Sequence, residues 1–195
     1  YRRIKIGQVV ANCHKVPQTE FSKELLSAEE VDVSLRNIME LIGSINQNAQ
    51  VIFTVSPVRH LKDGFVENQR SKAHLIAAVQ QLLEDSKSNG HSSYFESYEL
   101  MMDELRDYRF YTEDMVHPNA LAIDYIWEKF TEVWISESAY PIMQKVDTVQ
   151  KGLLHRPFNP ESEQYLQFQR TLQEKIAFLE REYRFMRFGE KDPTD

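Results

Sequence analysis

The chain has 195 residues, of which 42% are hydrophobic and 27% are charged, and its formal net charge is −7. This composition excludes a disordered chain and is typical of a globular protein with one sizeable core. The negative charge argues against nucleic acid or an anionic membrane as a partner, and no apolar run approaches the roughly 20 residues that span a bilayer. The single cysteine, Cys13, excludes an internal disulfide and favours a reducing compartment, with the cytoplasm as the expected location.

Extended structure is predicted for residues 1–11, with Gly7 near a turn, and a loop follows over residues 12–17. The chain enters the first strand at its first residue, as though a hairpin were already in progress. We therefore expect the domain to be incomplete at its amino terminus.

An amphipathic helix and a buried strand come next. Ser27 and Glu30 form the pattern of a capping box, in which the side chain of each residue accepts a hydrogen bond from the backbone N–H of the other. The helix that they open carries apolar residues at three- and four-residue spacing up to Ile45. Residues 51–55 are a short apolar run, which is typical of a strand buried on both faces.

Further elements alternate along the chain: a helix is predicted over residues 68–86, a strand over 94–100 and a short helix over 101–108. Strands that alternate with helices predict an α/β domain with a parallel sheet and right-handed crossovers. In such sheets the reactive loops gather at the carboxyl ends of the strands.

Asp114 lies three residues before His117, and Pro118 and a long amphipathic segment follow directly. Pro118 suits the first turn of a helix, and the apolar residues from Ala120 to Trp134 recur at helical spacing, which predicts one buried face. His117 is therefore expected in a loop that the packing of this helix fixes. A neutral imidazole there can act as a general base while a carboxylate holds its tautomer. The alternative is an ordinary polar surface loop.

Other polar candidates fall just after predicted strands: Asn12, His14, Ser56, Arg59 and His60. Asn12 suits an oxyanion donor or an Asx turn. Arg59 and His60 suit either a substrate pocket or a structural ion pair. Ser56 is disfavoured as a nucleophile because Pro57 stiffens the segment that separates it from His60. The histidines lack metal-ligand spacing such as His-x-x-x-His, so no metal site is predicted.

From about Tyr140 the character of the chain changes. Residues 152–160 read as an extended connector with two prolines, and residues 161–188 predict a long charged helix with an apolar seam. The seam is expected to pack within its own domain or against a partner, and a second copy of the chain is one such partner. We therefore expect a domain over residues 1–140 and a helical extension over residues 141–195.

Short motifs follow one another in order: VANCHKVP at residues 10–17, FTVSPVRHLKDG at 53–64, NQRSKA at 68–73, YFESYE at 94–99, DYRFY at 107–111 and HRPFN at 155–159. Together with the later Asp114 and His117, these motifs resemble the bacterial GSCFA-domain family. That family is similar to the SGNH/GDSL hydrolases, which implies a flavodoxin-like, three-layer α/β/α sandwich with a parallel sheet.

The resemblance maps the late Asp-x-x-His element of the SGNH hydrolases onto Asp114 and His117. It implies that His117 is the base for a catalytic serine and that Asp114 orients the base. The Gly-Ser-Cys-Phe-Ala segment that names the family does not occur in these 195 residues. We therefore expect the nucleophilic serine outside this chain, and we expect the chain alone to be inactive.

The expected function is hydrolysis or transfer of an ester without a cofactor, on a small molecule or, by the resemblance, an O-acylated carbohydrate. The alternative is a non-catalytic binding or scaffold module that uses the long carboxyl-terminal helix as its partner surface, including a homo-oligomer formed through that helix.

Overall fold

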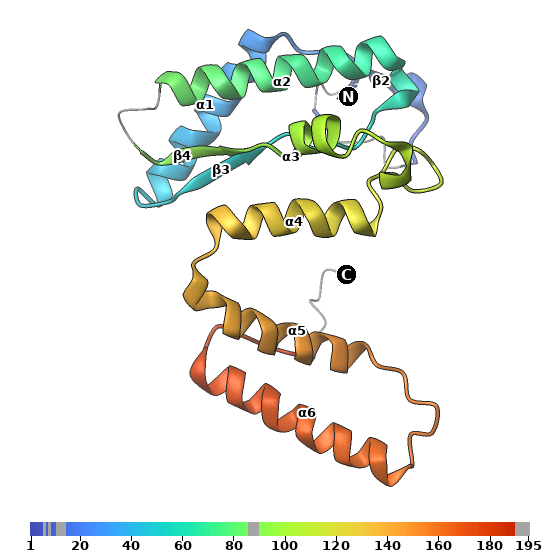
Figure 1. Cartoon of the computed structure of the whole chain (residues 1–195). Coiled ribbons are helices and arrows are strands. Elements are labelled where there is room, and N and C mark those ends of the chain that lie inside the picture. Colours follow the sequence, from blue (N-terminus) through green and yellow to red (C-terminus); the bar gives the residue numbers. More distant parts are fainter. Residues whose placement is uncertain (6, 8, 11–14, 86–89, 190–195) are drawn as a thin grey trace. The chain divides into compact units, whose positions relative to one another are not determined.

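The computed structural model describes residues 1–5, 7, 9–10, 15–85 and 90–189. They form two compact units, Tyr1–Phe130 and Thr131–Asp195 (Figure 1). Among the described residues, no helix is long and apolar enough to cross a membrane.

The amino-terminal segment contains less strand than its sequence predicts. Strand β1 (Arg2–Arg3) pairs antiparallel with β2 (Phe21–Ser22), and Arg2 also forms an isolated bridge with Val9. Gly7 lies in the bend between the bridged residues with φ of +66°, a conformation that glycine adopts without steric cost.

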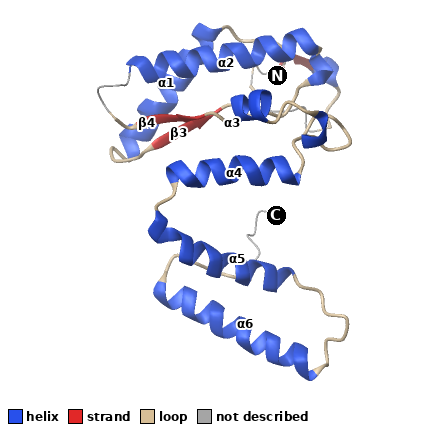
Figure 2. Ribbon diagram, in the orientation of Figure 1, coloured by secondary structure: helices blue, strands red, loops and turns tan. Residues whose placement is uncertain are grey.

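The centre of the first unit is a parallel β-α-β arrangement (Figure 2). Strand β3 (Val51–Thr54) pairs in parallel with β4 (Ser92–Phe95), and Ile52 lies opposite Ser93. Helix α2 (Phe65–Asp85) makes the crossover between them. The structure is therefore a mixed α/β fold with a parallel strand pair, as the alternation of elements predicts. Within the described residues β3 and β4 pair only with each other.

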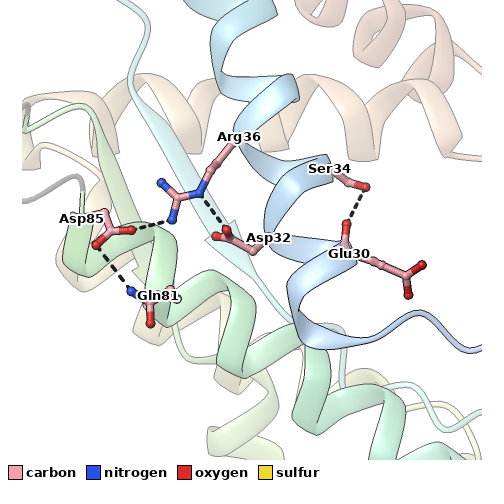
Figure 3. A network of polar contacts seen from close by, with 6 residues as sticks. All are labelled: Glu30, Asp32, Ser34, Arg36, Gln81 and Asp85. Atoms are coloured by element: carbon pink, nitrogen blue, oxygen red, sulfur yellow. Dashed lines mark hydrogen bonds and ion pairs between the residues drawn. The ribbon is translucent and has the colours of Figure 1, made fainter.

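Helix α1 (Ala28–Ile45) packs along α2 and begins at the predicted capping box. The Ser27 hydroxyl accepts from the Glu30 N–H at 3.2 Å, and the Glu30 carboxylate accepts from the Ser27 N–H at 2.8 Å. Further along α1, Arg36 donates to Asp32 at 2.7 Å and to Asp85 of α2 at 2.5 Å (Figure 3). This bridge fixes the two helices side by side.

The strand predicted over residues 94–100 ends earlier. Helix α3 (Ser97–Glu99) and a π-helical turn (Leu100–Glu104) replace its second half. The reason is visible in the packing, because Tyr98, Met101 and Leu105 are buried at three- and four-residue spacing. A β-strand would have placed Tyr98 on the opposite face of the sheet from Met101 and Leu105.

Helix α4 (Ala120–Trp134) confirms the predicted helix, although its predicted face is not uniformly buried. Ala122 is fully buried against Met101, Leu105 and Tyr111. In contrast, the side chain of Trp127 remains half exposed on the face that looks toward the strands. Ile52 of β3 is 38% exposed on the side that faces α4, so the prediction that β3 is buried on both faces is wrong there.

The second unit is a helical hairpin. Helix α5 (Tyr140–Leu154) and helix α6 (Glu163–Glu182) enclose a core of Val149, Leu172, Ile176 and Leu179. The predicted connector over residues 152–160 is helical up to Leu154. Gly152 allows this packing because a Cβ there would lie 2.6 Å from Leu172 Cδ1. The apolar seam of α6 thus packs within its own unit.

Candidate active site

The loop between Thr112 and His117 closes on itself through its backbone. The Thr112 N–H donates to the His117 carbonyl at 2.8 Å, and the Met115 N–H donates to the Thr112 carbonyl at 3.0 Å. Met115 has φ of +58°, in the left-handed region that residues other than glycine rarely adopt. This tight turn brings the side chain of Asp114 back over the residues that follow it.

Asp114 is the hydrogen-bond acceptor at the centre of this turn. Its Oδ1 accepts from the Thr112 hydroxyl at 2.6 Å, the Val116 N–H at 2.8 Å and the His117 N–H at 3.0 Å. The Thr112 hydrogen bond, followed by those from His117 and Val116, holds the pKa of Asp114 well below its ordinary value. Asp114 is therefore a carboxylate whose orientation is set by three donors.

The second oxygen of Asp114 meets the histidine ring. Oδ2 lies 2.6 Å from His117 Nδ1, although both side chains remain about half exposed. An ionised carboxylate accepts, so Nδ1 carries the proton and Nε2 is left with its lone pair. A histidine in this tautomer can accept a proton at Nε2 while the carboxylate stabilises the imidazolium that results.

Asn119 connects this loop to α4. Its side-chain amide donates to the Arg109 carbonyl at 2.7 Å, its backbone N–H donates to the Phe110 carbonyl at 2.9 Å, and its Oδ1 accepts from the Ala122 N–H at 3.1 Å. The last bond is that of a helix N-cap. Pro118 therefore lies just outside the helix rather than in its first turn, and it bridges to Tyr111 instead.

The loop that follows β3 lies against the loop that carries His117. The Arg59 N–H donates to the Val116 carbonyl at 3.2 Å, and its Nη1 donates to the Met115 carbonyl at 3.3 Å. The Arg59 guanidinium also lies 4.1 Å from the centre of the Tyr111 ring, within cation–π distance. The structure thus brings Arg59 to the backbone beside the dyad.

The other predicted site residues have different positions. Ser56 Oγ accepts locally from the Val58 N–H at 3.3 Å, and the His60 side chain is exposed. Asn12 and His14 lie outside the described residues, so their predicted roles stay predictions. Among the described residues there is no group of three or more His, Cys, Asp or Glu side chains placed to hold a metal ion.

A cleft of about 600 Å³ lies between the strands and α4, and His117 is one of its lining residues. The lining is otherwise mostly apolar: Ile52, Pro57, Val58, Phe95, Pro118, Ile123, Ile126, Trp127 and Phe130. Its two hydroxyls, Thr54 and Ser97, lie 2.6 Å from each other, and Ser97 also donates to the Val55 carbonyl at 3.0 Å. His117 therefore supplies the titratable group of the cleft.

Two buried polar residues of α2 are missing from the sequence-based candidates. Asn68 is 7% exposed and Lys72 is 3% exposed, and both bond to the loop of residues 56–60. Helical periodicity alone assigns polar residues to a solvated face. The signal that marks them is that they share a helical face with the buried Val79.

No curated protein and no solved structure matches this chain significantly. Two family models do match. The model described as GSCFA domain protein, C-terminal domain, covers residues 146–191. The model described as GSCFA family covers residues 1–130, which is most of the chain and includes the Asp114–His117 loop. The chain therefore belongs to the GSCFA family.

Proposed function

We propose that this protein contributes the base of a serine esterase or acyl transferase of the SGNH/GDSL type. One observation carries the proposal: His117 donates Nδ1–H to a carboxylate that three further donors orient, and its ring lines an apolar cleft. A dyad of this kind has the fixed tautomer and the oriented carboxylate that activation of a hydroxyl nucleophile requires.

In the proposed reaction a serine hydroxyl from polypeptide outside these 195 residues attacks the ester carbonyl. His117 Nε2 takes the serine proton, and Asp114 stabilises the imidazolium without accepting that proton. The imidazolium then protonates the leaving alcohol as the acyl-serine forms. Water or an acceptor alcohol attacks this acyl-serine through the same base. Backbone N–H groups, with Asn12 as a side-chain candidate, hold the oxyanion.

The substrate class follows from the family resemblance alone, which is an analogy and not a derivation from the site. It favours an O-acylated carbohydrate or a small ester. The apolar cleft beside His117 can accept the acyl group of such a substrate.

The proposed function requires a more complete sheet than β3 and β4. We infer a three-layer α/β/α sandwich, with α2 on one side of the strands and α4 on the other (Figure 1). Parallel sheets are covered on both faces and rarely consist of two strands alone. Within the described residues, the edge of β3 away from β4 has no partner strand, and a further parallel strand would pair there.

Ester turnover by the complete open reading frame that contains these residues tests the proposal. The assay compares the native protein with His117→Ala and with Asp114→Asn, which keeps an oxygen for the turn but presents an amide to Nδ1. We expect each variant to lower kcat by about 10⁴-fold, on the order of the losses for members of such triads. If His117→Ala leaves turnover unchanged, the assignment is wrong. If the native protein hydrolyses no ester, the binding or scaffold module becomes the better account.

A further inference from the structure

Helix α2 buries two polar side chains one turn apart, Asn68 and Lys72, whose exposed fractions are 7% and 3%. A buried ammonium is costly unless it is paired or hydrogen-bonded, and Lys72, which forms no ion pair with a carboxylate of the described residues, depends on a hydrogen bond to a backbone carbonyl. Desolvation accordingly lowers the pKa of Lys72. A buried lysine therefore needs its hydrogen-bond acceptor in a fixed position.

Both side chains bond to the same loop, at its two ends. Lys72 Nζ donates to the Ser56 carbonyl at 2.5 Å, and Asn68 Oδ1 accepts from the His60 N–H at 2.8 Å. The Lys72 ammonium also lies 5.9 Å from the centre of the Tyr98 ring. The five-residue loop that leaves β3 is therefore clamped to α2 by its first carbonyl and its last N–H.

The loop transmits this clamp to the dyad. Arg59, next to the clamped end, bonds to the carbonyls of Val116 and Met115 at 3.2 and 3.3 Å. These two residues lie between Asp114 and His117 in the chain. A continuous set of hydrogen bonds thus runs from α2 through Arg59 to the turn that aligns the dyad.

We propose that Asn68 and Lys72 are positioning residues for His117: they hold the 56–60 loop so that Arg59 fixes the backbone of the Asp114–His117 turn. This gives a role to the NQRSKA motif, which contains both residues and which the ester chemistry leaves unused. The consequence for catalysis rests on the proposed function. The consequence for the geometry of the His117 ring does not.

The first test is the two-bond proton–nitrogen NMR correlation of the His117 ring in this 195-residue chain, assigned with His117→Gln. This signal reports the tautomer and the hydrogen bond at Nδ1. Asn68→Leu and Lys72→Met remove one clamp each, and we expect the His117 correlation to shift or broaden in both. Asn68→Asp keeps an acceptor for the His60 N–H and should restore the native signal.

Gln69→Leu is the matched control. Gln69 adjoins Asn68 on α2 and also accepts one side-chain hydrogen bond, from the Tyr98 hydroxyl at 2.7 Å, but it does not bond to the 56–60 loop. Its variant should leave the His117 correlation native. A native correlation in folded Asn68→Leu and Lys72→Met would overturn the proposal. If those variants do not fold, Arg59→Met decides, because it removes the guanidinium contact with the Met115 carbonyl. A native His117 signal in that variant would overturn the proposal.

The second test uses the complete reading frame and a soluble ester. Displacement of a base by about 1 Å lowers catalysis on the order of 10²-fold, so Lys72→Met should lower kcat by that factor with KM unchanged. The two proposals can fail separately. If the clamp variants shift the His117 signal but the complete protein turns over no ester, the positioning role is supported and the proposed function is refuted. If Lys72→Met turns over the ester with the kcat of the native protein, the positioning role is refuted and the proposed function is not.

Discussion

Met115→Gly is a sharp test of the turn that aligns the dyad. Met115 is 54% exposed and has φ of +58°, and its N–H closes the turn on the Thr112 carbonyl. Its side chain contributes little burial, so the substitution acts mainly through the backbone. Glycine occupies this left-handed conformation without the clash between Cβ and the following carbonyl oxygen.

The magnitude follows from two opposing effects. Relief of the left-handed strain is worth about 1–2 kcal/mol. The greater freedom of glycine in the unfolded chain costs about 0.4–1 kcal/mol. We therefore expect Met115→Gly to raise the free energy of unfolding of the first unit by about 1 kcal/mol.

Urea unfolding followed by circular dichroism measures this change. Val116→Gly is the control, because Val116 is next in the chain and lacks a positive φ. There the entropic effect adds to the loss of the partly buried Val116 side chain, and stability should fall by at least about 0.4–1 kcal/mol. If Met115→Gly lowers stability as much as Val116→Gly does, the turn does not have the geometry described, and the alignment of Asp114 with His117 loses its basis.

Three further predictions concern other parts of the chain. Tyr111→Phe removes a buried hydroxyl that has no partner among the described residues, so it should not destabilise the protein. Tyr98→Phe loses the hydrogen bond to Gln69 and should lower the free energy of unfolding in urea by about 1 kcal/mol. Equal losses in the two variants would contradict this. Gly152→Ala should destabilise the helical hairpin by about 1–3 kcal/mol in thermal unfolding, because its Cβ would lie 2.6 Å from a Leu172 methyl, and a neutral effect would refute the close packing. The pKa of Asp114 is lowered in the folded state, so its contribution to stability is present above the ordinary carboxyl pKa of about 4 and is lost as the pH falls further. The stability difference between the native protein and Asp114→Asn should therefore shrink as the pH falls from about 6 to about 2, and parallel curves would contradict that reasoning.

Local rules predict part of this structure well. The capping box at Ser27 and Glu30 and the helix that follows are governed by neighbours in the sequence, and both are present. The pairing of Asp114 with His117 is similarly local, because a turn of four residues suffices to bring their side chains together. Such features depend on contacts within one turn of the chain, which a sequence displays directly.

Contacts between distant segments are what the sequence conceals. The strand predicted over residues 94–100 gives way to helix because Met101 and Leu105 pack against Ala122 of α4. Lys72 and Asn68 share a helical face with the buried Val79, but the partners of their polar groups are known only once the 56–60 loop is placed over them. The presence of Ile52 and Thr54 on one face of β3 does not predict the cleft, because the depth of the cleft depends on where α4 lies.

Covalent labelling tests the central claim most directly. The complete reading frame is treated with a fluorophosphonate, which reacts with activated serines, and its intact mass is compared with that of His117→Ala treated in the same way. The proposal predicts one adduct on the native protein and none on the variant, because in the proposed mechanism His117 Nε2 takes the serine proton. No adduct on the folded native protein, or an equal adduct on His117→Ala, would contradict the role of the Asp114–His117 pair as the base of a serine hydrolase.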